Sequence, residues 1–137
     1  MTLRERFDRK AKALLRRHSI KHLPLDRRYW RESMAYANHS ITAPWPVDSR
    51  TFCIFAHELA HVVLDHMGTY DWGWREIEAD LWAMKQLAAV KGRVPITVSR
   101  DVARNAGRIL RRAASGCYVG RRLDLGGLVA AAKAGQV

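Results

Sequence analysis

The sequence predicts a small, mostly helical α+β fold with a single domain over residues 1–137. Apolar residues recur at spacings of three and four along most of the chain, which is the pattern of helices with one buried face. Short segments with strand-like alternation occur only over residues 34–46. A chain of 137 residues with 48% hydrophobic residues has the size and composition for one hydrophobic core.

The first helix is predicted over about residues 2–17, as a lid or brace across the core. Its apolar positions follow helical spacing, with Arg and Lys between them: Leu3, Phe7, Ala11, Leu14 and Leu15. Residues 18–30 contain Pro24 and are expected to form a connection in which Tyr29 and Trp30 pack against the core.

The β structure is predicted between Met34 and Pro46. Met34 and Tyr36 alternate with smaller residues, and the stretch Ser40–Ala43 follows. We expect Ser40–Ala43 to be the edge strand beside the next helix, where an extended peptide could be added as a further strand.

That next helix carries the strongest chemical signal in the chain. It is predicted to begin after Asp48 or Ser49 as the N-cap and to run to about His66. Within this predicted helix, residues 52–64 form an apolar run that is interrupted by two histidines and one glutamate.

These three residues form a His-Glu-x-x-His (HExxH) motif. His57 and His61 are four residues apart and hence share a helix face, where two imidazoles can hold one Zn²⁺ at about 2.0–2.1 Å. Glu58 is then placed to take a proton from a zinc-bound water. Random ordering of this composition would give the motif roughly one time in a hundred. The alternative is a core helix with hydrogen-bonded histidines, whose burial would cost several kcal/mol without partners.

A third protein ligand has to come from elsewhere. His66 is one residue out of register with the metzincin pattern. The predicted helix at residues 74–83 offers Glu76 and Asp80 on one face, with Glu78 roughly opposite. We expect Glu76 to be the ligand, with Glu78 in reserve, and Asp80 to accept the N–H of a ligating histidine. A solvated acidic face is the alternative interpretation.

The combination of the HExxH motif with Glu76-Ile77-Glu78-Ala79-Asp80 resembles the compact gluzincin-type peptidases of the ImmA/IrrE family. It resembles more loosely the zincin domain of ArdC-type antirestriction proteins. The resemblance covers about residues 34–90. It implies a zincin-like fold and a cytoplasmic metallopeptidase that cuts a regulatory protein. It also implies zinc ligation by two histidines and a glutamate, with the motif glutamate as general base; these positions are His57, His61, Glu76 and Glu58.

Two more helices are expected after the motif. Residues 68–73 are predicted to be a short loop, and the acidic helix should end near Lys91, before Gly92. Another helix should follow Pro95 with Ser99 as its cap. It has an apolar stripe opposite a ridge of four arginines, Arg100, Arg104, Arg108 and Arg111. This Arg ridge could bind a polyanion or could be an ordinary solvated face. Residues 123–129 are expected to add a final short helix.

Charge and targeting signals limit the class of protein. The net charge is +11, with basic flanks at residues 1–31 and 91–137 around an acidic centre at residues 32–90, which could dock a polyanion or serve solubility. No membrane span or signal peptide is expected, which predicts a cytoplasmic protein with Cys53 and Cys117 reduced.

The sequence therefore predicts a zinc-dependent metalloendopeptidase that acts on a protein substrate, such as a nucleic-acid-associated regulator. The alternatives are a nucleic-acid-binding or antirestriction-type module on a zincin scaffold, and an interaction protein with a structural metal site. Glu58 favours the enzyme over a structural site, which would not need it.

Overall fold

A computed structural model describes residues 1–66 and 72–114, in two compact units, Met1–Met67 and Gly68–Val137. The first unit contains α1 (Leu3–His18), β1 (Lys21–Pro24), the 3₁₀ helix η1 (Arg27–Glu32), β2 (Met34–Tyr36), β3 (Ser40–Ala43) and α2 (Ser49–Val63). The second contains α3 (Trp72–Lys91) and α4 (Ile96–Ala114). The predicted α+β class, mostly helical with a small sheet, is confirmed. Within the described residues, none of the helices has the length and apolar character needed to cross a membrane.

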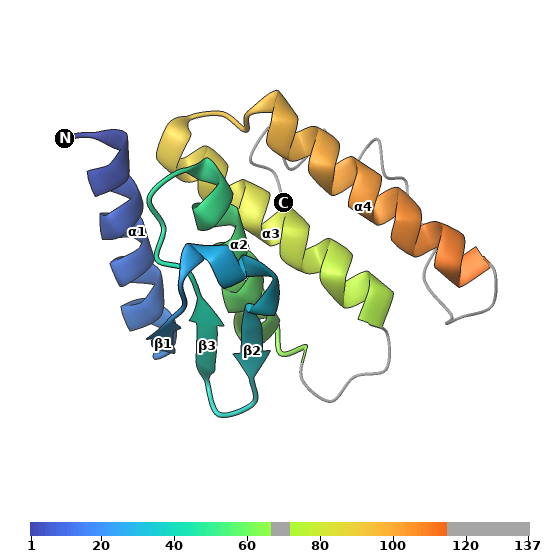
Figure 1. Ribbon diagram of the computed structural model, residues 1–137, viewed down its shortest axis with the longest axis horizontal. Coiled ribbons are helices and arrows are strands. Elements are labelled where there is room, and N and C mark those ends of the chain that lie inside the picture. The colour runs from blue at the N-terminus through green and yellow to red at the C-terminus, as the bar shows by residue number, and fades with distance from the viewer. Residues whose placement is uncertain (67–71, 115–137) are drawn as a thin grey trace. The chain divides into compact units, whose positions relative to one another are not determined.

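The sheet of the first unit has the strand order β1-β3-β2 (Figure 1). β1 runs parallel to β3, while β2 is antiparallel to it. The prediction that Ser40–Ala43 forms the edge is therefore wrong, because this strand lies between the other two. Its burial agrees with a central place: Ile41 and Ala43 are fully buried. β1 was not predicted, because Lys21–Pro24 has no apolar alternation.

The core of the first unit lies between α1, α2 and the sheet. Phe7 of α1 stacks on Phe52 of α2 with ring centroids 5.1 Å apart, and both are fully buried. Phe55 is also fully buried and meets the Trp45 ring edge-on at 5.7 Å. The Trp45 indole N–H donates to Asp8 of α1 at 3.0 Å, which fixes the loop before α2 to the brace helix. The predicted first helix and its bracing contact are thus observed.

η1 differs from the predicted packing connection. Tyr29 is 50% exposed, so its prediction as a core anchor is wrong. Trp30 is half-buried, and the guanidinium carbons of Arg31 and Arg50 lie 5.1 and 4.9 Å from its ring centroid. These aromatic residues sit among cations, which can stack on them while remaining solvated.

α2 begins with a capping box at Asp48, one of the two predicted N-cap residues. The Thr51 amide donates to Asp48 Oδ1 at 2.8 Å, and the Asp48 amide donates to Thr51 Oγ1 at 3.1 Å. Two amides of the first turn are thereby satisfied. The helix ends at Val63, three residues before the predicted end at His66.

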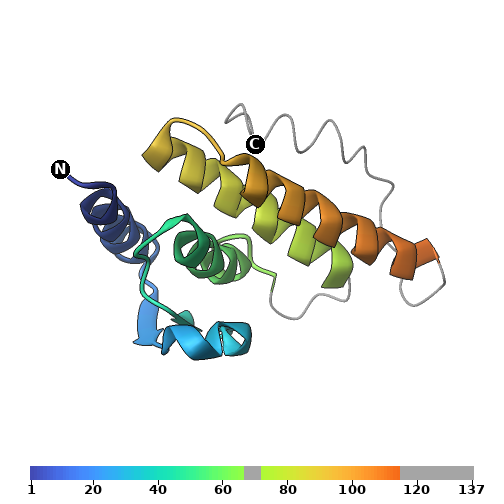
Figure 2. The same ribbon diagram turned by 45° about the horizontal axis from the view of Figure 1, so that its top comes forward.

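The second unit is an antiparallel hairpin of α3 and α4, which lie side by side in both ribbon views (Figures 1 and 2). Its core contains Ile77, Leu81 and Met84 from α3, and Val102, Ala106 and Ile109 from α4. α3 ends at Lys91 as predicted, and Gly92 follows with a φ of +79°.

Two boundaries in the second unit differ from the prediction. α3 already begins at Trp72, within the predicted loop. α4 begins at Ile96, directly after Pro95, so the prediction of Ser99 as its cap is wrong. Ser99 is 3% exposed, and its hydroxyl donates to the Ile96 carbonyl at 3.0 Å inside the first turn. The predicted loop residues 68–71, Cys117 and the final helix at 123–129 lie outside the described residues.

Candidate metal centre

α2 presents its two motif histidines on one face. The Nε2 atoms of His57 and His61 are 3.1 Å apart. Two nitrogens bound to one tetrahedral zinc at about 2.0–2.1 Å would be about 3.3 Å apart. The pair therefore fits a shared zinc ion with a small adjustment of the side chains.

The opposite face of α2 explains why the histidines are held this way. Five residues at positions i, i+3, i+4, i+7 and i+8 are fully buried in the first unit: Phe52, Phe55, Ala56, Leu59 and Ala60. Such a stripe fixes the rotation of the helix about its axis. His57, Glu58 and His61 then fall at the half-buried border of the packed face. There the side chains are partly shielded from water.

Glu58 follows His57 directly and is half-buried. Successive residues on a helix are separated by about 100°, so its carboxylate leaves the helix beside the histidine pair and not in line with it. A general base beside a metal held by the two histidines would need this position.

A third histidine joins the pair, and sequence reasoning missed its role. His66 lies beyond the end of α2 and is 6% exposed. Its Nδ1 is 2.9 Å from Nδ1 of His61. The spacing of the metzincin motif excludes His66 as a direct metal ligand. That spacing does not consider whether a residue can contact one of the ligands. The one available signal was a histidine five residues after His61, close to a helix end.

The predicted acidic residues all lie on α3. Glu76, Glu78 and Asp80 are each half-buried. Helical geometry places Glu76 and Asp80 on one face and turns Glu78 roughly 160–200° away from them. Asp80 Oδ2 accepts a hydrogen bond from the side-chain amide of Asn105 on α4 at 3.2 Å. Asn105, a second residue that sequence reasoning did not single out, thus holds the Asp80 carboxylate within the hairpin.

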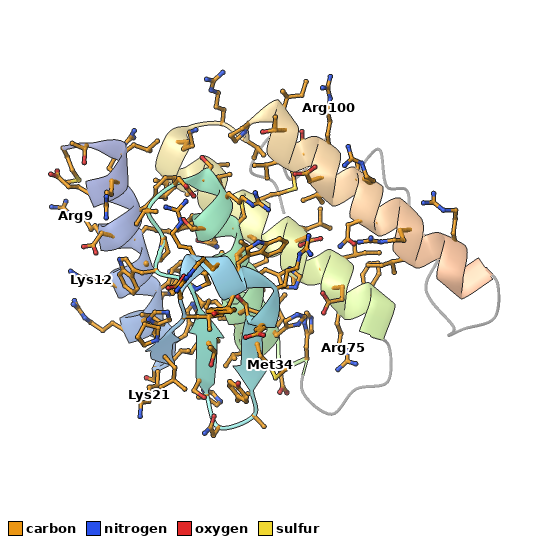
Figure 3. All side chains as sticks on the ribbon, viewed as in Figure 1. Arg9, Lys12, Lys21, Met34, Arg75 and Arg100 are labelled. Carbon is orange, nitrogen blue, oxygen red and sulfur yellow. The ribbon has the colours of Figure 1, made fainter. Side chains whose placement is uncertain are left out.

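The four arginines of the Arg ridge are all exposed on α4. Figure 3 shows Arg100 extending outward from the helix. Arg104 lies 3.7 Å from Asp101, and both side chains are more than 70% exposed, so water screens this pair strongly. Arg108 donates to Asn105 Oδ1, which links the ridge to the residue that holds Asp80. The ridge is therefore a solvated cationic surface on one side of the hairpin.

Comparison of the chain with protein-family models, with curated proteins and with solved structures gave no match.

Proposed function

We propose that the protein is a zinc-dependent metalloendopeptidase that hydrolyses a peptide bond of a protein substrate. The observation that carries the proposal is the convergence of His57 and His61, whose Nε2 atoms are 3.1 Å apart, with Glu58 beside them on the same helix. A structural zinc site would use its ligands alone. Peptide hydrolysis also requires a general base, and a carboxylate next to the ligand pair can serve as one.

The third ligand in this proposal is Glu76, and Glu78 is the alternative. Two histidines and one glutamate form a known catalytic zinc set that leaves one position for water. Glu76 shares its helix face with Asp80, so a carboxylate that binds the metal and one that accepts a histidine N–H would come from neighbouring turns. Asn105 supports this arrangement, because its hydrogen bond restrains the Asp80 carboxylate.

Glu58 performs the proton transfers. A bound zinc ion would lower the pKa of a coordinated water to about 7 and polarise the scissile carbonyl. The Glu58 carboxylate accepts the proton from the attacking water and delivers it to the leaving amine nitrogen, so that the carboxylate is regenerated in each cycle. Its half-buried position limits competing hydrogen bonds with bulk water.

An extended substrate would be held by β2. The strand order leaves β1 and β2 as the edges of the sheet, and β2 also packs against α2, the helix with the histidine pair. Strand addition at this edge would bind the main chain of a peptide with little dependence on its sequence. Met34 and Tyr36 are exposed on β2 and would contact the substrate side chains.

The decisive experiment compares the wild type with Glu58→Gln. We expect the variant to keep its fold and its zinc but to lose proteolysis by at least about 10²-fold, the typical contribution of a positioned general base. Because the substrate is unidentified, proteomes of cells that express either form are searched for fragments present only with the wild type. His57→Ala serves as the control that loses both metal and activity. Identical proteomes and identical cellular effects for the wild type and Glu58→Gln would refute the proposed peptidase function.

The identity of the third ligand is tested separately. Glu76→Gln should weaken zinc binding, measured by competition with a chelator, far more than Glu78→Gln does. The two variants carry the same change of charge on the same helix, so each is the matched control of the other. The reverse ranking would assign the ligand to Glu78.

The exposed Arg ridge favours a second candidate function, nucleic-acid binding. Contacts with phosphates would give an affinity that falls steeply with salt and depends little on base sequence. Arg104→Glu with Arg108→Glu should weaken a gel-shift complex, whereas Lys85→Glu with Arg93→Glu makes the same charge change at exposed positions off the ridge. Absence of any complex with single- or double-stranded DNA or RNA at low salt would remove this candidate.

A further inference from the structure

The backbone at the end of α2 folds His66 back onto the helix. Asp65 has a φ of +53°, in the left-handed region. Its amide donates to the Val62 carbonyl at 3.2 Å, and the His66 amide donates to the His61 carbonyl at 2.9 Å. This pair of bonds is the Schellman motif, which normally brings together the side chains of the two residues joined by the longer bond. Here those residues are His61 and His66.

The rings of His61 and His66 approach each other through their Nδ1 atoms. Nδ1 of His66 lies 2.9 Å from Nδ1 of His61, while Nε2 of His61 lies 3.1 Å from Nε2 of His57. The two nitrogens of an imidazole point to opposite sides of the ring. His66 is therefore behind His61 as seen from His57, where it cannot share a metal with them but can act on the ligand.

Metal binding through Nε2 of His61 would fix the positions of the protons in this geometry. A neutral imidazole carries one proton, so His61 can offer a lone pair at Nε2 only when its proton is on Nδ1. That proton then points at Nδ1 of His66, which must accept it and keep its own proton on Nε2. The tautomer of His61 that can bind a metal through the nitrogen facing His57 is therefore the one that donates this hydrogen bond to His66.

We propose that His66 is a positioning residue that fixes the tautomer and ring orientation of His61 for zinc binding. The inference rests on the proposed zinc site. Metal-ligating histidines commonly donate their second N–H to a fixed acceptor, which orients the ring and raises its basicity. His66 suits this task because it is 6% exposed and its own amide is bonded to the His61 carbonyl. The same backbone turn therefore holds both the His61 ring and its acceptor, His66.

The first test measures zinc affinity by chelator competition. His66→Phe keeps a ring of similar size but removes the acceptor, and we expect it to bind zinc about 10–100-fold more weakly than the wild type. His66→Asn keeps an oxygen acceptor near the place of Nδ1, and we expect it to recover most of the loss. Wild-type affinity in His66→Phe would overturn the inference and leave the zinc site intact. Absence of zinc binding by the wild type would instead refute the proposed function itself.

The second test uses the metal-free wild type and needs no variant to fold. Imidazole ¹⁵N NMR at about pH 8, above the ordinary histidine pKa of about 6.5, distinguishes the two neutral tautomers. We expect His61 to carry its proton on Nδ1 and His66 on Nε2. A proton on Nε2 of His61 would overturn the inference even if zinc binding is normal.

Discussion

The helices α1 and α2 end with the same backbone motif but use it for different purposes. Each has a residue with a φ of +53° just beyond its last turn, Ser19 after α1 and Asp65 after α2. In each, the next amide donates to the carbonyl five residues earlier at 2.9 Å. The residues joined in this way are Leu15 and Ile20 at α1, and His61 and His66 at α2.

The difference lies in the chemistry of these pairs. The motif usually joins two apolar residues, and α1 follows that rule with Ile20 only 6% exposed. α2 places two imidazoles in the same geometry, where burial costs free energy unless the polar atoms are hydrogen-bonded. The end of α1 therefore stabilises the first unit, whereas the end of α2 gives up apolar burial in order to orient a ring. A polar pair at the two positions of this motif that are usually apolar indicates a functional site better than histidine content alone does.

The largest effect is expected from giving α2 the pair that α1 has. His61→Leu with His66→Ile should abolish stoichiometric zinc binding, because a direct ligand is removed. The metal-free protein should be as stable as the wild type or more stable by about 1 kcal/mol, since two apolar side chains replace two imidazoles. Elemental analysis and urea unfolding with chelator present measure the two quantities.

The matched control exchanges the two residues at the other end: Leu15→Ile with Ile20→Leu changes α1 in the same geometry and should leave zinc binding unaffected. Stoichiometric zinc in the α2 double variant would show that His61 is not a ligand.

The next effect separates packing from positioning. Ile20→Ala should lower the free energy of unfolding by about 2 kcal/mol or more, because it removes buried methylene groups and leaves a cavity. Zinc affinity of the folded protein should not change. Urea unfolding in the presence of chelator, followed by chelator competition, gives both values. A loss below about 0.5 kcal/mol would mean that the α1 pair contributes little packing, and the contrast between the two helix ends would fail.

The structural features that could be predicted from the sequence are those with local causes. The apolar stripe of α1, the Asp48 cap and the four-residue spacing of His57 and His61 are each decided within one or two helical turns. The Arg ridge on α4 is predicted for the same reason, since helical periodicity alone places its four residues on one exposed face.

The parts that sequence did not predict have non-local or unmarked causes. β1 exists because Lys21–Pro24 pairs in parallel with β3, a partner about twenty residues away, and the same pairing makes β3 central. The role of His66 depends on the helix ending at Val63. Glycine, the usual mark of such an ending, is absent there, and Asp65 adopts the left-handed conformation in its place.

A smaller effect should follow from supplying that glycine at both ends. Ser19→Gly and Asp65→Gly each relieve the cost of a left-handed L-residue, and we expect a gain of about 0.5–1 kcal/mol in the free energy of unfolding after the extra entropy of glycine is included. Urea unfolding of the metal-free protein measures the gain, with Ser19→Ala and Asp65→Ala as controls that keep the strain. Zinc affinity should be unchanged in Asp65→Gly. A large change would mean that the Asp65 carboxylate itself contributes to the site.

The smallest effect concerns the residue just before the left-handed position, which is His18 in α1 and Leu64 in α2. Partial burial lowers the pKa of His18, and the positive charge of Arg17 lowers it further. The unfolded chain therefore takes up a proton at this residue before the folded chain does, so the contribution of His18 to stability is present above about pH 6.5 and is lost as the pH falls through the lowered pKa. His18→Leu, which gives α1 the residue of α2, should reduce the loss of stability between pH 7.5 and 5.5. Because the ring is partly solvated, the difference in unfolding free energy should stay below about 0.5 kcal/mol. If the variant instead loses more stability in acid than the wild type, the favourable interaction of a charged histidine with the helix C-terminus would outweigh burial and the repulsion by Arg17.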